Sequence, residues 1–417
     1  MGGNATLEYK TKRITKEENE KIINFLFDSL NKDKNFSSKN ELFGIPLSYS
    51  EKESFGDIDL LTTMNLIELL NKLSKNSNIL IEPKYLAKKR DKNGFRINSQ
   101  IESIPVKIKT NEFETDFFQL DLILTTKENF DNHLRYLSFN DLGALIGRIA
   151  YSQGLRFGES GLYYNFPFEH KFTEMLGKTK LFISNDYFKI LNMLGFENLP
   201  NKEDIKGIEK FNEQFKNKID IFNFIISNKN FNAEDFSVST KNSKTKSRDR
   251  KRSTMKGFLD FLIEKRYLTK EQAFGDKEEV DRDEVDRGEK IDKGILKIEE
   301  FIDKGFIEQN FINHQLAKIK ENLKEAALKK NFNKKFSGDV VIDLMNEKFK
   351  EDYDLLKPKE LASMVSRLKT FMLDYFKERN LTKEQVLNLP EEEIKNKLIE
   401  LLEEQFKKKR VIKIKTL

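Results

Sequence analysis

Two aspartates separated by one apolar residue constrain this chain more than any other feature of its sequence. They are Asp57 and Asp59, in the segment SFGDIDLL at 54–61. Acidic and apolar residues alternate here, which predicts a β-strand over 57–63. Residues two apart on a strand point to the same face, so both carboxylates would project together while the apolar residues between them enter the core.

A third acid, Asp121, lies in an otherwise apolar segment, FFQLDLILT at 117–125, which also predicts a strand. Two adjacent carboxylates repel each other strongly unless a cation lies between them. Asp57, Asp59 and Asp121 together could hold two Mg²⁺ or Mn²⁺ ions about 3.5–4 Å apart. The alternative is an exposed pair on a surface strand. Gly56 before the pair and the apolar flanks of all three acids favour the metal site.

Composition narrows the chemistry further. The chain has no cysteine, which excludes disulfides and thiolate metal sites and fits a reducing compartment, so we expect a cytoplasmic protein. Its three histidines, His133, His170 and His314, are far apart. Carboxylates must therefore supply any metal ligands, which favours Mg²⁺ or Mn²⁺. No apolar run approaches the roughly 18 residues of a membrane span, and the start does not resemble a secretory signal.

The chain is long enough for two or three domains. With 38% hydrophobic and 35% charged residues, it can bury real cores under a solvated surface. We expect an α+β fold, in which a small mixed-sheet catalytic domain (1–130) is followed by a middle domain (131–240). A charged linker or loop (241–290) and a mainly α-helical C-terminal domain (291–417) complete it.

Local patterns predict the main elements. Thr15 and Glu18 form a capping box that begins a helix, and Thr382 and Pro390 mark later helix starts. The remaining predicted helices and strands are helices at 65–75, 139–151 and 186–194, and strands at 78–82, 94–98 and 104–109.

The pattern Gly-Asp-apolar-Asp, followed some 60 residues later by apolar-Asp-apolar, resembles the DNA polymerase beta-type nucleotidyltransferase superfamily. That group includes poly(A) polymerases, CCA-adding enzymes and many phage and viral proteins. The resemblance covers about residues 42–125. It implies a mixed-sheet palm and transfer of a nucleoside monophosphate from an NTP by two metal ions. Asp57 and Asp59 match the paired metal ligands, and Asp121 matches the third, which also activates the acceptor hydroxyl.

The chain departs from the family at the phosphate-binding turn. Members usually carry Gly-Ser or Gly-Gly about ten residues before the first aspartate, where this chain has Pro46-Leu47. The alternative that this chain is a degenerate, inactive member of the family therefore stays open. Nearby residues could supply the hydrogen-bond donors that this turn provides for the phosphates. The predicted nucleotide-binding residues are Gly44, Ser48, Ser50, Lys52, Ser54 and Gly56.

Arg148 and Arg156 are the other candidates for triphosphate contacts, in a stretch with clustered glycines and the pair Tyr163-Tyr164, which could stack on a base. The alternative is a helix and a hairpin whose glycines only make turns.

A basic cluster precedes an amphipathic helix and is a candidate for binding nucleic-acid backbone. It consists of Arg248, Arg250, Lys251 and Arg252. The alternative is a solvated charge run. In the tail, segments 336–349 and 357–376 resemble the helical C-terminal part of CCA-adding and poly(A)-polymerase-like enzymes, which implies that the tail embraces an RNA acceptor.

The leading interpretation is template-independent addition of NMP to an RNA 3′ end, with an NTP substrate and Mg²⁺ or Mn²⁺. The alternatives are NMP transfer to a protein or a small molecule, or a catalytically silent nucleic-acid-binding module.

Overall fold

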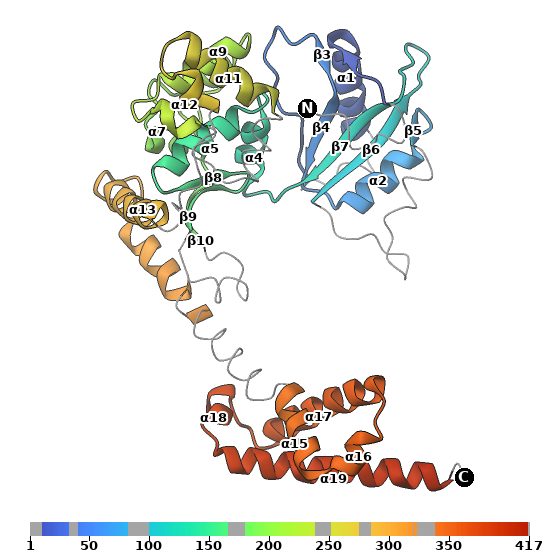
Figure 1. Cartoon of the computed structure of the whole chain (residues 1–417). Coiled ribbons are helices and arrows are strands. Elements are labelled where there is room, and N and C mark those ends of the chain that lie inside the picture. Colours follow the sequence, from blue (N-terminus) through green and yellow to red (C-terminus); the bar gives the residue numbers. More distant parts are fainter. Residues whose placement is uncertain are drawn as a thin grey trace. The chain divides into compact units, whose positions relative to one another are not determined.

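The computed structural model describes residues 11–32, 41–81, 100–165, 180–237, 252–274, 285–319, 321–322 and 338–415. They form two compact units, one extending to Ile312 and the other beginning at Asn313 (Figure 1). The fold is α+β, with a mixed sheet near the N-terminus and a helical C-terminal region, as the sequence predicts. The strand predicted at 94–98 lies outside the described residues.

A five-stranded sheet organises the N-terminal part of the first unit. Its order is β2 (Phe43–Gly44), β4 (Asp57–Thr62), β7 (Phe118–Leu124), β6 (Ile101–Ile108) and β5 (Ile79–Ile81). The central pair, β4 and β7, is parallel, and the other neighbours are antiparallel. Two short strands, β1 (Ile14–Thr15) and β3 (Ser54–Phe55), pair beside it.

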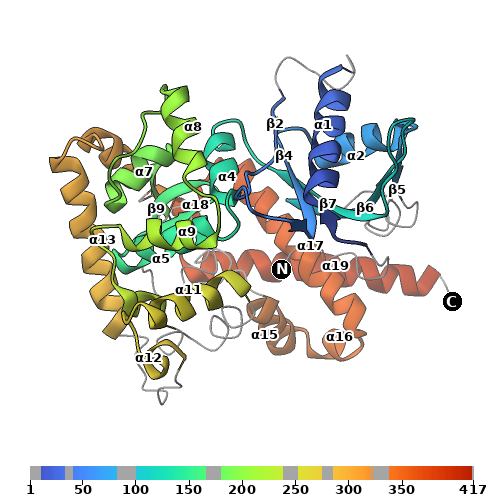
Figure 2. The same cartoon turned by 90° about the horizontal axis from the view of Figure 1, so that it is seen from above.

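One face of this sheet is covered by two helices, α1 (Lys16–Lys32) and α2 (Leu66–Lys75), which lie on the same side of the strands in Figure 2. The predicted capping box is present, since the Thr15 N–H donates to the Glu18 carboxylate at 2.7 Å and the Glu18 N–H donates to the Thr15 hydroxyl at 3.2 Å. Both helices pack on alternate residues of the strands, so the intervening residues belong to the opposite face.

The helix predicted over 139–151 is shorter in the structure. Phe139 and Asn140 have φ values of 57° and 59°, in the left-handed region, and α5 runs from Leu142 to Ser152. A preceding helix that the sequence pattern did not indicate, α4 (Phe130–Leu137), ends just before them. The sharp bend at 139–140 places the Asn140 side chain beside Lys52, whose ammonium donates to its amide oxygen.

The rest of this unit contains a small antiparallel sheet and further helices. Strands β8 (Arg156–Gly158), β9 (Gly161–Asn165) and β10 (Lys180–Ser184) form the sheet. The helices are α7 (Tyr187–Leu194), α8 (Ile205–Glu213), α9 (Lys218–Ile226), α11 (Ser253–Glu264), α12 (Lys270–Phe274) and α13 (Val285–Asp303), with a 3₁₀ turn η2 (Ala233–Phe236). Phe258 and Leu262 of α11 are fully buried, so this part of the predicted linker 241–290 is folded core.

Two glycines of α5 offer a matched test of its packing. A Cβ on Gly143 would overlap the carbonyl oxygen of Tyr136, whereas the nearest atom to a Cβ on Gly147 is 3.5 Å away. We expect Gly143→Ala to lower the free energy of unfolding by about 2 kcal/mol. Gly147→Ala should change it little or raise it by up to about 1 kcal/mol, because alanine favours the helix. Urea unfolding measures both, and equal effects would contradict the close α4–α5 packing.

The second unit is helical. Its described elements are α15 (Gly338–Lys348), α16 (Lys350–Asp354), α17 (Pro358–Glu378), α18 (Lys383–Leu387) and α19 (Glu391–Lys415). Thr382 caps α18 through reciprocal bonds with Gln385, and Pro390 directly precedes α19, so both predicted helix starts are confirmed.

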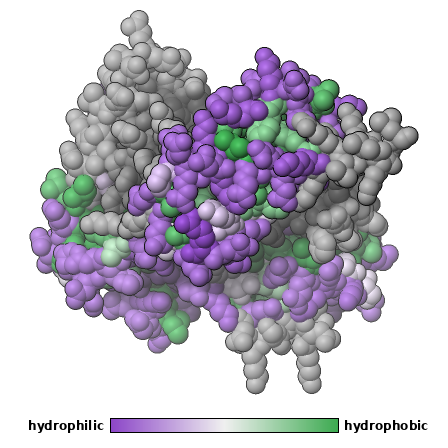
Figure 3. Space-filling model, turned by 90° about the horizontal axis from the view of Figure 1, so that it is seen from below, coloured by the Kyte–Doolittle hydropathy of each residue, from purple (hydrophilic) through white to green (hydrophobic). Residues whose placement is uncertain are grey.

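Among the described residues, no helix is both long and apolar enough to cross a membrane. On the face that Figure 3 shows, hydrophilic residues cover most of the described surface and hydrophobic ones form small separate groups.

Candidate metal centre

The paired aspartates lie at the beginning of β4, where a bend at Gly56 leads from β3 into the sheet. Ile58 and Leu60 are 3% and 0% exposed and belong to the core under α1 and α2. Asp57 and Asp59 alternate with them and are therefore on the opposite face, where both are partly buried. The local sequence thus directs both carboxylates to the face opposite α1 and α2.

The third acid is brought to the pair by the parallel register of β4 and β7. Asp121 pairs directly with Asp59, and Gln119 pairs with Asp57. One carboxylate oxygen from each of the three aspartates lies within 4.8 Å of the others. The structure therefore brings together the three residues that the sequence singles out as metal ligands.

Burial and mutual repulsion perturb this cluster. Burial raises the pKa of Asp59 to about 7, the negative charges of Asp57 and Asp121 contribute, and the positive charge of Lys52 partly opposes the rise. Carboxylates held this close favour protonation or a bound cation.

Asp121 is oriented by its neighbours on the sheet. Burial raises its pKa, against hydrogen bonds from Ser103 and Gln119 that stabilise the charged form. The Gln119 amide donates to both Asp121 oxygens, at 2.9 and 3.1 Å. Ser103 lies on β6, directly opposite Asp121. These bonds fix the carboxylate in place before any ligand arrives.

The donor set fits a hard divalent cation. All three groups are carboxylates that share one face of the sheet, and oxygen ligands of this type suit Mg²⁺ and Mn²⁺. A cation among them would also relieve the repulsion that raises the pKa of Asp59. Asp57, Asp59 and Asp121 would hold it.

Lys52 supplies positive charge next to this centre. Its ammonium donates to the Asn140 amide oxygen at 3.1 Å and to the Ser48 hydroxyl at 3.5 Å, and it lies 4.4 Å from the centroid of the Phe55 ring. Burial lowers the pKa of Lys52, and the charges of Asp57 and Asp59 oppose that shift. Two predicted nucleotide-binding residues, Ser48 and Lys52, therefore lie together beside the acidic cluster.

Other predicted phosphate-binding residues have structural partners. The Ser54 hydroxyl accepts a hydrogen bond from Arg13 at 2.8 Å, and the Ser50 carbonyl accepts one from Lys16 at 2.9 Å.

Gly44 belongs to β2, and a Cβ there would lie 3.0 Å from the Phe130 ring and 3.1 Å from the Leu134 side chain. Its lack of a side chain thus lets α4 approach the sheet. Gly44 itself lies in a strand, whereas Ser48 and Ser50 lie outside the strands.

The predicted arginines that the structure describes lie on later elements of the first unit. Arg148 lies on α5, and Arg156 of β8 lies over the Tyr151 ring, 4.2 Å from its centroid. Arg252 forms an ion pair with Asp141 at 3.7 Å. Asp141 is the residue that follows Asn140 in the sequence. The other members of the basic cluster, Arg248, Arg250 and Lys251, lie outside the described residues, as does His170.

Three residues near the site were not sequence candidates. Arg13 and Lys218 are close enough for their charges to lower the pKa of Lys52, and Gln119 holds Asp121. The alternation of β7 could have identified Gln119, two residues from Asp121. Nothing in the sequence pattern connects Lys218 to Lys52, 166 residues earlier.

Comparison with known proteins adds no family assignment, since no protein-family model matches the chain and no curated protein sequence is significantly similar to it.

Proposed function

We propose that this chain is a metal-dependent nucleotidyltransferase that transfers NMP from an NTP. The observation that carries the proposal is the pairing of Asp59 with Asp121 across two parallel strands, with Asp57 two residues away on the same face. Three convergent carboxylates on one face of a mixed sheet suit the two-metal chemistry of phosphoryl and nucleotidyl transfer.

The residues divide into ligands and supporting groups. Asp57, Asp59 and Asp121 would hold Mg²⁺ or Mn²⁺, which when bound supplies Lewis-acid stabilisation of the reacting phosphate and hydroxyl. Asp121 lies at the edge of the cluster nearest β6 and would accept the proton of the attacking hydroxyl. Lys52 offsets negative charge on the departing pyrophosphate.

We propose an RNA 3′ end as the acceptor. Support comes from Arg252, the last residue of the basic cluster, which forms an ion pair with Asp141. Asp141 follows Asn140, whose side chain accepts a hydrogen bond from Lys52. A basic segment that ends beside the proposed site could guide a phosphate backbone toward it.

The test is incubation of the purified chain with Mg²⁺, each labelled NTP and mixed cellular RNA, beside an Asp57→Asn/Asp59→Asn variant. Label in RNA that depends on the two aspartates supports the proposal. Label in protein would instead identify a protein as the acceptor of the NMP. Equal background in both proteins would refute nucleotidyl transfer and leave a nucleic-acid-binding module.

Lys52 gives a separate prediction. Lys52→Met should weaken NTP and pyrophosphate binding about tenfold, because one charge-assisted contact contributes about 1.5 kcal/mol. Calorimetry on the Mg²⁺-loaded protein measures this. The control is Lys72→Met on α2, whose ammonium pairs with Glu68 on the other side of the sheet. Equal affinities of the two variants would exclude a phosphate role for Lys52.

A further inference from the structure

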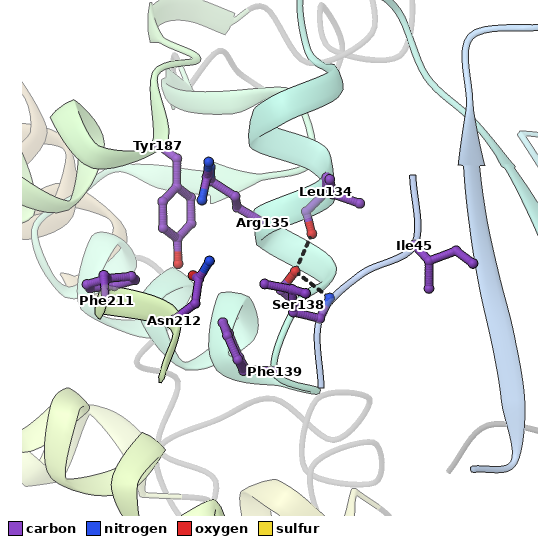
Figure 4. A pocket seen from close by; sticks show the side chains of 9 residues that line it. Ile45, Leu134, Arg135, Ser138, Phe139, Tyr187, Phe211 and Asn212 are labelled. Carbon is purple, nitrogen blue, oxygen red and sulfur yellow. Dashed lines mark hydrogen bonds between the residues drawn. The ribbon is translucent and has the colours of Figure 1, made fainter. Parts of the chain in front are cut away.

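A cavity of about 190 Å³ lies between the segment that precedes the metal centre and the helices α4, α7 and α8 (Figure 4). Its walls are mainly apolar and aromatic. The lining residues are Ile45, Leu47, Leu134, Arg135, Ser138, Phe139, Tyr187, Phe211 and Asn212. An apolar cavity of about 150 Å³ admits benzene, so this one has room for a planar heterocyclic ring.

Two polar groups in the wall are already engaged. The Ser138 hydroxyl donates to the Leu134 carbonyl at 2.8 Å and accepts from the Leu47 N–H at 3.0 Å. The Arg135 guanidinium is bonded to Asp131, with Nε 3.0 Å from the nearer carboxylate oxygen. These interactions hold the wall together.

Two other polar groups are not engaged. Tyr187 is 3% exposed, yet its hydroxyl has no hydrogen-bond partner within the described parts of the chain, and the same is true of the Asn212 side-chain amide. Figure 4 shows both groups on the same side of the cavity. A tyrosine hydroxyl and an amide that line a cavity and form no hydrogen bond within the described residues can each bond to a molecule that enters it. Burial also raises the pKa of Tyr187, which keeps the hydroxyl a donor.

Two residues that line the cavity directly precede the two residues that hold Lys52 beside the metal centre. Leu47 in the cavity wall is followed by Ser48, and Phe139 is followed by Asn140. Ser48 and Asn140 are the two residues that accept hydrogen bonds from the Lys52 ammonium. The backbone also joins the two walls, since the Phe139 N–H donates to the Leu47 carbonyl at 2.6 Å. A ligand that spans cavity and cluster would place its charged part at Lys52.

We propose that this cavity binds the base of the nucleotide, with the Tyr187 hydroxyl and the Asn212 amide hydrogen-bonding the edge of the ring. The ring's identity as a nucleotide base rests on the proposed function. An amide offers one donor and one acceptor side by side, which is the pattern that base edges complement. Tyr187 and Asn212 would therefore determine which base is selected.

The experiment measures equilibrium binding of the four NTPs, the four free nucleosides and inorganic tripolyphosphate to the Mg²⁺-loaded chain by calorimetry. The variants are Asn212→Ala and Tyr187→Phe, and the second keeps the ring packed against Phe157 and Phe188. Matched controls are Asn201→Ala, in an exposed turn, and Tyr267→Phe, which is 49% exposed.

We expect both variants to bind the preferred NTP about tenfold or more weakly and to lose the preference among bases. Tripolyphosphate affinity should stay at the wild-type value, and both controls should behave as the wild type. Unchanged affinities and preferences in Asn212→Ala and Tyr187→Phe would overturn the base pocket while leaving the proposed function standing. If the wild type binds no triphosphate and transfers no nucleotide, the proposed function fails. In that case nucleoside binding alone tests the pocket. The wild type must bind a nucleoside more tightly than Asn212→Ala does, and equal affinities would overturn the pocket.

Discussion

Asp57→Asn is expected to reduce NMP transfer at least about 10³-fold, a loss of about 4 kcal/mol of transition-state stabilisation. The physical reason is the removal of one of three negative charges that would hold the metal ions, while the shape of the side chain is kept. Asp57 is partly buried at the beginning of β4, so asparagine fits the same space and the sheet should remain folded. Initial rates of NTP-dependent labelling, with circular dichroism as a check on folding, measure the effect.

The matched control is Asp116→Asn. Asp116 lies just before β7, and its carboxylate pairs with Lys12 at the surface, with 64% of the side chain exposed. Its loss should leave the rate within about twofold, since exposed ion pairs contribute little. Equal rates for Asp57→Asn and the wild type would remove Asp57 from the catalytic centre.

The second large effect concerns stability. Asp59→Asn is expected to raise the free energy of unfolding of the metal-free protein by about 2–4 kcal/mol at pH 8. The pKa of Asp59 is about 7 in the folded chain, against about 4 for an unfolded aspartate. Between those values the folded state binds more protons than the unfolded one, so stability falls as the pH rises from about 4 to 7. Above pH 7 the full penalty is present, and asparagine removes it.

Urea unfolding in a chelator, at pH 5 and at pH 8, measures this. The difference between Asp59→Asn and the wild type should grow with pH, and Mg²⁺ should stabilise the wild type but not the variant. Asp116→Asn should give no such gain, because the Lys12 ion pair lowers the pKa of Asp116 instead of raising it. A variant less stable than the wild type at pH 8 in chelator would contradict the electrostatic description of the site.

The sheet and its acids were predictable because alternation is a local signal. Asp57 and Asp59 are separated by one core residue, and Asp121 lies between two leucines that are fully buried. The register of β4 against β7 was not predictable, since a slip of two residues keeps every side chain on its face. Such a slip would move Asp121 away from Asp59, and only the folded structure shows the two paired.

The surroundings of the acids were less predictable, for a different reason. Phe139 continues the apolar spacing of a helix, so the pattern does not reveal the left-handed bend that brings Asn140 to Lys52. Tyr187 and Asn212 come from helices about 140 residues or more after Leu47, and no local pattern joins them. Long-range packing, which periodicity does not encode, determines those contacts.

The central test of the proposed metal centre is Mn²⁺ binding to the purified chain, followed by electron paramagnetic resonance. We expect the wild type and Asp116→Asn to bind Mn²⁺ equally, and we expect Mg²⁺ to compete for the site. In the Asp57→Asn/Asp59→Asn variant the affinity should fall more than the roughly 10–100-fold typical of losing an outer-shell partner. Equal Mn²⁺ binding by all three proteins, or none by the wild type, would contradict a metal centre at Asp57, Asp59 and Asp121.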